Sequence, residues 1–192
     1  ALPILFFTAI SIICDYYIAY MAIIGLTLYF VFRLIEEGYD FKKTCLSFFL
    51  YAVHGFFSAG LSCFILVPVI FDFLRGKIAS GEAVNSSLFF KFSVFDLLKN
   101  FLPQSYSNLG INQVPNIYCS VFVLVSVAAF FISKKTNART KLTAFLIILF
   151  YFCSFIISPL DRVWHGFRDP LSFSCRYSFT FCFFMICIAL RG

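Results

Sequence analysis

The feature that most constrains this chain is a series of long apolar runs separated by short polar segments. A helix needs about 20 apolar residues to cross the hydrocarbon of a bilayer, and the first run, residues 2–32, exceeds that length. Charged residues make up only 12% of the chain and hydrophobic ones 61%, so a polar shell for a water-soluble domain is lacking. We therefore expect an all-α, polytopic integral membrane protein with about five to six membrane helices in a single domain.

The hydropathy pattern places the expected spans at residues 2–14 and 18–35, 45–71, 116–132, 142–157 and 175–190. Residues 72–115 and 158–174 are expected to form outer loops. The first of these loops contains an amphipathic stretch, Val94–Leu102, that is typical of a helix lying along the membrane interface. Because the chain begins and ends within apolar sequence, we expect a fragment of a longer polytopic protein, covering residues 1–192.

Two polar residues interrupt the apolar runs. Asp15 leaves two alternatives open: one tilted span that carries an internal carboxylate, or a short helix, a turn near Asp15 and a second span. The turn is favoured because a bare carboxylate inside the bilayer costs roughly 3 kcal/mol. We interpret His54 as a hydrogen-bonded packing residue, and the neighbouring Gly55 and Gly60 as points of close helix approach.

Basic residues indicate the orientation of the spans, because loops rich in Lys and Arg stay in the cytoplasm. Residues 33–43 carry three Lys or Arg in 11 positions, and residues 133–141 carry four in nine. The segments 72–115 and 158–174 are much less basic. We therefore expect these two segments to share the outer face of the membrane.

Several other classes of function lack their sequence signals. Basic residues do not form a block interleaved with polar surface, so nucleic acid is not an expected partner. The eight cysteines form no CxxC pair, and neither histidine stands near two of them. We therefore expect no metal site and no cofactor.

Two polar segments, residues 101–118 and 161–178, meet at the expected outer face. Arginine forks suit phosphate oxygens, aromatic faces suit sugar rings, and amide groups suit hydroxyls. Together these groups would suit a lipid-linked sugar phosphate. Arg176 is the strongest candidate because it lies just inside an apolar run, where a charge needs a partner. The alternative that these residues only anchor the protein in the interface stays open.

Several stretches of the chain resemble the bacterial YfhO family of membrane proteins. They occur in the same order along the chain as the corresponding stretches of the family. Together they span nearly all of the chain. They are Asp15-Tyr-Tyr-Ile-Ala-Tyr-Met21, Gly60-Leu-Ser-Cys-Phe-Ile-Leu-Val-Pro68, Phe95-Asp-Leu-Leu98, Leu102-Pro-Gln-Ser-Tyr106, Pro115-Asn-Ile-Tyr118, Trp164-His-Gly-Phe167 and Arg176-Tyr-Ser-Phe179. The chain departs from the family pattern at Cys119-Ser120, where a glycine is expected.

This resemblance implies a GT-C-like glycosyltransferase of the bacterial plasma membrane. Such an enzyme would move a sugar from a polyprenyl-phosphate donor to a cell-envelope polymer such as lipoteichoic acid, in contact with membrane lipids. Its catalytic carboxylate is expected in the first outer loop, upstream of Ala1. The alternatives are a membrane transporter or lipid flippase, for which broken helices would be suited, and a non-catalytic membrane subunit.

For such a reaction, the chemistry of their side chains suggests roles for the candidate substrate-binding residues. Arg176 and Arg162 are expected to hold the donor phosphate, Trp164 and Tyr118 to stack on sugar, and Asn116, Gln104 and His165 to bond hydroxyls.

Overall fold

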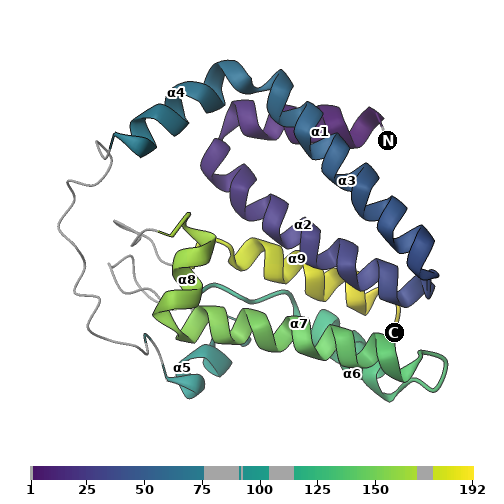
Figure 1. Cartoon of the computed structure of the whole chain (residues 1–192). Helices are drawn as coiled ribbons and strands as arrows, with labels where there is room; N and C mark the ends of the chain where they lie inside the picture. The colour runs from purple at the N-terminus through teal and green to yellow at the C-terminus, as the bar shows by residue number, and fades with distance from the viewer. Residues whose placement is uncertain (1, 76–90, 92, 104–114, 168–174) are drawn as a thin grey trace.

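The computed structural model describes residues 2–75, 91, 93–103, 115–167 and 175–192, and they form helices joined by loops. This confirms the expected all-α fold (Figure 1). The helices are α1 (Leu2–Cys14), α2 (Tyr16–Glu37), α3 (Phe41–Leu61), α4 (Cys63–Leu74), α5 (Val94–Lys99), α6 (Val121–Ile132), α7 (Ala138–Ile156), α8 (Ser158–Trp164) and α9 (Ser178–Ala189).

Helices α2, α3 and α7 are each long and apolar enough to cross a membrane. Shorter apolar stretches lie in α1, α4, α6 and α9. Helix α3 turns its large side chains outward, and Phe56, for example, is 76% exposed. An apolar helix that contacts so little protein is typical of one surrounded by lipid.

Asp15 separates α1 from α2, which decides between the two alternatives left open by the sequence. Its backbone is extended, and its carboxylate accepts hydrogen bonds from the backbone N–H groups of Tyr17 and Ile18, at 3.0 and 3.1 Å. Asp15 is thus an N-cap, which supplies acceptors to N–H groups that have no partner within the helix.

The expected span 45–71 is divided by a second break, at Ser62, between α3 and α4. The Ser62 hydroxyl donates to the backbone carbonyl of Ala9, at 3.1 Å, and Ser58 donates in the same way to Leu5, at 3.0 Å. Both bonds tie α3 to α1. The break thus occurs where the chain contacts another helix, and Pro68 lies inside α4 without ending it.

Other helix bounds also differ from the expected spans. The span expected from residue 116 becomes helical only at Val121, after Ser120 adopts a φ of 91°. The span expected from residue 175 begins at Ser178, because Cys175 has a φ of 61°. The segment expected as the outer loop 158–174 begins with helix α8, which is partly buried.

Close helix approach occurs at a different glycine from those expected. Gly55 and Gly60 have open space where a side chain would begin, whereas Gly25 of α2 lies directly against Thr180 of α9. Nδ1 of His54 donates a hydrogen bond to the Leu50 carbonyl one turn earlier, at 2.5 Å.

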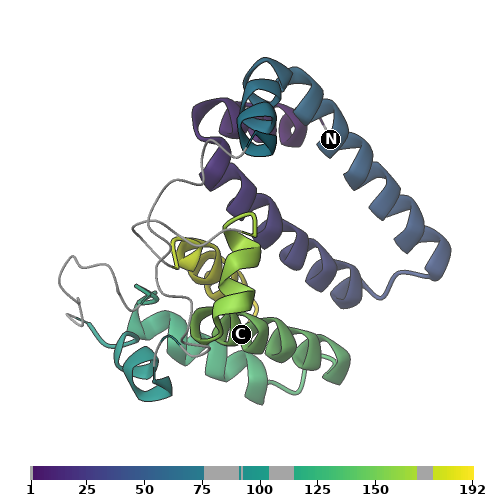
Figure 2. The same ribbon diagram turned by 60° about the vertical axis from the view of Figure 1, so that its left-hand side comes forward.

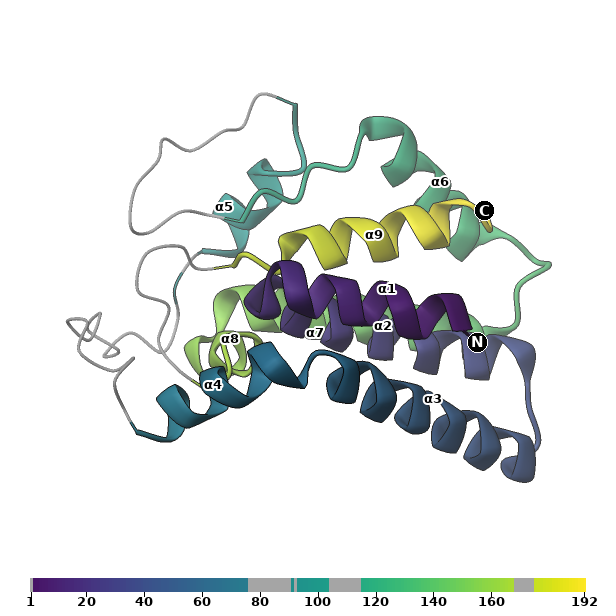
Figure 3. The ribbon, with the colours of Figure 1, turned by 90° about the horizontal axis from the view of Figure 1, so that it is seen from above.

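Helix α2 lies between two groups of helices (Figures 1 and 2). On one side it packs on α1, which packs in turn on α3. On the other side it packs on α7 and α9, and α6 covers α9. Seen from above, α6, α9, α1 and α3 follow one another across the molecule (Figure 3).

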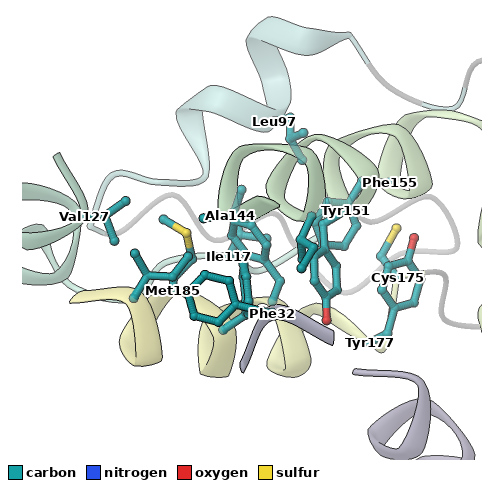
Figure 4. Packing of buried hydrophobic residues seen from close by; sticks show 14 of the residues in the cluster. Phe32, Leu97, Ile117, Val127, Ala144, Tyr151, Phe155, Cys175, Tyr177 and Met185 are labelled. Carbon is teal, nitrogen blue, oxygen red and sulfur yellow. The ribbon is translucent and has the colours of Figure 1, made fainter. Parts of the chain in front are cut away.

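The buried core lies within the second group of helices, and aromatic rings fill much of it (Figure 4). Tyr177 stacks on Phe155, with ring centres 5.1 Å apart, and on Trp164, with ring centres 4.4 Å apart. Trp164 stacks in turn on Tyr151, at 5.3 Å. This column of rings supports the residues at one end of the bundle.

The two ends of the helices differ in character. The α2–α3 connection, the α6–α7 connection and the C-terminus lie at one end (Figure 1). These two connections lie within the basic segments 33–43 and 133–141 of the sequence. The break at Asp15, helix α8 and the start of α9 lie at the other end (Figure 1). The side of the membrane on which each end lies stays a prediction from the basic residues.

Candidate functional site

A cluster of interacting polar side chains, several of them buried, lies at the end opposite the basic connections, where α8, the first turn of α2 and residues 175–177 before α9 meet. Helix α8 places Asp161 and His165 four residues apart, on one face. Pro159 in its first turn suits a helix start. Gly166 then reverses the chain with a φ of 67°, a conformation that favours glycine.

Asp161 is the buried charge of this site, with a side chain that is 0% exposed. It forms an ion pair with Lys91, and its Oδ1 atom lies 3.5 Å from Nε2 of His165. Burial by itself raises the pKa of the Asp161 carboxyl, but the contacts with His165 and Lys91 outweigh burial and hold the pKa below its ordinary value. Asp161 is therefore ionised at neutral pH.

His165 connects this buried carboxylate to α2. Its Nδ1 atom forms a hydrogen bond with the hydroxyl of Tyr17. The guanidinium of Arg176 lies over the Tyr17 ring, 5.5 Å from its centre, as in a cation–π contact. Arg176 is exposed, Tyr17 is half-buried and His165 is buried. The contacts thus run from the interior to the surface.

Tyr177 closes the inner side of the site. Its ring lies against that of His165, with ring centres 6.2 Å apart, and Cys175 lies at the same end of the core (Figure 4). Burial, together with the nearby Cys175 and Asp161, raises the pKa of Tyr177 well above its ordinary value. Tyr177 is therefore a neutral residue of the site.

The expected site residues differ in where they lie. Arg176 and His165 come together around Tyr17, and Arg162 lies partly exposed on α8. Trp164 is 0% exposed and stacked on other rings, so its faces are closed to a sugar.

The second polar segment lies before α6. Asn116 and Tyr118 are exposed there, and Asn100 holds the segment by donating to the Pro115 carbonyl, at 3.0 Å. None of the contacts described for the Asp161 cluster involves Asn116 or Tyr118. Gln104 lies outside the described residues.

Sequence reasoning did not place Tyr17, Lys91 or Tyr177 in the site. The i, i+4 spacing of Asp161 and His165 was a signal that they share a helix face. Lys91 carried no such signal, because it lies 70 residues before its partner. Among the described residues, no group of three or more His, Cys, Asp or Glu side chains is arranged to hold a metal ion.

Apolar helices with outward-facing aromatic side chains, and a polar cluster at one end, define a multi-pass helical membrane protein. A family model described as "Bacterial membrane protein YfhO" matches residues 2–192. The chain therefore belongs to the YfhO family, as its sequence motifs suggested. No curated protein and no solved structure matches the chain.

Proposed function

We propose that this YfhO-family protein is a GT-C-like glycosyltransferase that acts at the outer face of the membrane. The donor would be a polyprenyl-phosphate sugar, and the acceptor an envelope polymer such as lipoteichoic acid. The observation that carries the proposal is the exposed Arg176 guanidinium, held beside the buried Asp161–His165 pair at the end opposite the basic connections.

Arg176 would bind the donor phosphate, with Arg162 contributing from α8. A guanidinium binds phosphate oxygens through two N–H groups at once, which fixes both position and charge. Helix α8 and the first turn of α9 lie near the expected membrane surface. A prenyl phosphate bound there by its phosphate group would therefore keep its prenyl chain in the lipid.

The other candidates take revised roles in this proposal. Tyr118 and Asn116 are exposed and remain available for sugar stacking and hydroxyl bonding. Trp164 supports Tyr177 from within the core. Asp161 is not proposed as the base that deprotonates the acceptor, because it is buried and ion-paired.

The test is Arg176→Ala in the full-length protein. We expect loss of sugar transfer to the polymer, with normal expression. Arg139→Ala is a matched control, because it removes the same charge from an exposed position at the opposite end of α7. Normal glycosylation of the polymer in the Arg176→Ala strain would remove this residue from the proposed site.

A lipid flippase is the second candidate, and the two helix breaks at Asp15 and Ser62 favour it. A flippase would move a lipid-linked sugar across liposome membranes without forming a glycosidic bond. Purified full-length protein in liposomes separates the two functions: a flippase changes the leaflet of the labelled lipid, whereas a transferase consumes it only when acceptor is present.

A further inference from the structure

We infer that the Tyr17 hydroxyl is a further contact for the ligand's phosphate group beside Arg176, and that His165 and Asp161 position it. The inference rests on the proposed function for the class of ligand, a phosphate ester. It adds Tyr17 of α2 to a site that is otherwise built from α8 and residues 175–177 before α9. It also makes binding of the phosphate depend on uptake of a proton.

The graded burial of the contacts supports a positioning role for the inner residues. Asp161 is 0% exposed and His165 is 5% exposed, so neither reaches a ligand at the surface. Tyr17 is half-buried, and its ring lies beneath the exposed Arg176 guanidinium. Tyr17 is therefore the member of this chain of contacts that joins the buried carboxylate to the surface.

The chemistry of His165 determines which way the Tyr17 hydroxyl donates. The Asp161 carboxylate is an acceptor, so it favours a proton on Nε2, the ring nitrogen that faces it. In a neutral imidazole, Nδ1 then has a lone pair and accepts from the Tyr17 O–H. In a protonated imidazole, Nδ1–H donates to the Tyr17 oxygen, and the hydroxyl proton is released to donate to a phosphate oxygen.

Phosphate binding should therefore be coupled to the uptake of one proton by His165. The charged neighbours of His165 are the Asp161 carboxylate and the cations Lys91 and Arg176, and Tyr17, Tyr177 and Cys175 complete its surroundings. An arriving phosphate offsets the two cations, so that the anion and the proton bind together.

The neighbouring Tyr20 gives a matched control. It lies one turn along the same helix, but its hydroxyl donates to the Val163 carbonyl, at 2.9 Å, and is already engaged. Removal of either hydroxyl takes one hydrogen bond from α2. Only Tyr17 is next to both His165 and Arg176.

The test uses the full-length protein in detergent and two probes, a short-chain prenyl monophosphate and inorganic phosphate. Dissociation constants are measured at about pH 5.5 and about pH 8.5, on either side of the range in which imidazoles ordinarily titrate. Wild-type protein should bind more tightly at the lower pH. Tyr17→Phe should weaken binding at that pH by about tenfold or more, as expected for loss of a charge-assisted hydrogen bond, and should abolish the pH effect.

Two further variants test the positioning role. Asp161→Asn should reduce the pH effect while Tyr17 is retained, and His165→Gln serves the same purpose if the Asp161 variant does not fold. Tyr20→Phe should leave both affinity and pH effect unchanged. Unchanged binding in Tyr17→Phe, or an equal loss in Tyr20→Phe, would overturn the inference.

The two probes and a turnover measurement separate this inference from the proposed function. Tyr17-dependent binding of both probes assigns the site to the phosphate group, and binding of the prenyl probe alone assigns it to the lipid-linked form; either result supports the inference. If the wild-type protein transfers no sugar but binds phosphate through Tyr17, the transferase proposal fails and the inference stands. If sugar transfer occurs and Tyr17→Phe changes neither transfer nor binding, the inference alone fails.

Discussion

Gly25 of α2 lies so close to Thr180 of α9 that a β-carbon on residue 25 would come within 2.7 Å of the Thr180 Cβ atom. Thr180 has little freedom to move away. Its hydroxyl donates to the Tyr177 carbonyl, at 2.7 Å, and accepts from the Tyr151 hydroxyl, at 3.1 Å. The approach of α2 to α9 therefore depends on the absence of a side chain at Gly25.

Gly25→Ala should destabilise the protein in detergent. Alanine favours a helix by roughly 1 kcal/mol over glycine, but overpacking costs about 1–3 kcal/mol, so the net effect is a loss. Gly55→Ala is the control, because it meets open space and should be neutral or stabilising. The unfolding temperature should therefore fall in Gly25→Ala and stay unchanged or rise in Gly55→Ala. Equal shifts would contradict the argument from close packing.

Ser120→Gly should stabilise the start of α6. Ser120 has a φ of 91°, which strains any residue with a β-carbon by about 1–3 kcal/mol. Glycine would lose the hydrogen bond from the Phe122 N–H to the Ser120 hydroxyl, 3.3 Å long, but glycine at an N-cap costs only a few tenths of a kcal/mol. Ser120→Ala, which loses the cap and keeps the strain, should unfold at a lower temperature than wild type. A lower unfolding temperature for Ser120→Gly would show that the cap outweighs the strain.

Ser58→Ala combined with Ser62→Ala should weaken the contact between α1 and α3. Each hydroxyl shares its proton between a backbone carbonyl of α1 and the carbonyl one turn earlier in its own helix, and bonds between membrane helices contribute on average about 0.6 kcal/mol each. The expected loss is therefore about 1 kcal/mol, measured by unfolding in mixed micelles. Ser11→Ala is the control, because the Ser11 hydroxyl donates only within its own helix, to Phe7. A comparable loss in Ser11→Ala would argue against a specific contribution from the bonds to α1.

Acid should destabilise the Asp161 cluster. The pKa of Asp161 lies below its ordinary value of 3.8 in the folded protein, so the unfolded chain takes up the proton first as the pH falls. The stabilisation is complete above the ordinary pKa and is lost as the pH falls through the lowered one. The unfolding temperature should thus fall as the pH is lowered from about 5 to about 3. Asp161→Asn should flatten this part of the profile, and an unchanged slope would count against the contacts of Asp161 with His165 and Lys91 as its source.

The sequence indicated much of the fold because run length and charge are local properties. The apolar runs identified the membrane helices approximately, and Asp15 marked a helix break because an isolated carboxylate is better used as a cap than buried in lipid. The break at Ser62 had no comparable local signal. It coincides with the hydrogen bond to Ala9, a residue of another helix.

The candidate site was predicted in part. Arg176 and His165 were identified as candidates because they are polar residues next to apolar runs. The structure brings them to the same end of the bundle. Trp164 was expected to face a ligand, but it lies inside the aromatic column. Tryptophan suits both an interface and a core, so its identity alone does not decide between them.

The sequence by itself determined that this chain forms membrane helices with one strongly basic end, because hydropathy and charge act on each segment independently of its neighbours. Only the tertiary structure decided that Lys91 neutralises Asp161, that Tyr17 reaches His165, and that Gly25 rather than Gly55 admits another helix. These pairings join segments far apart in the sequence. They depend on which helix faces meet, and many apolar faces of similar composition could have met instead.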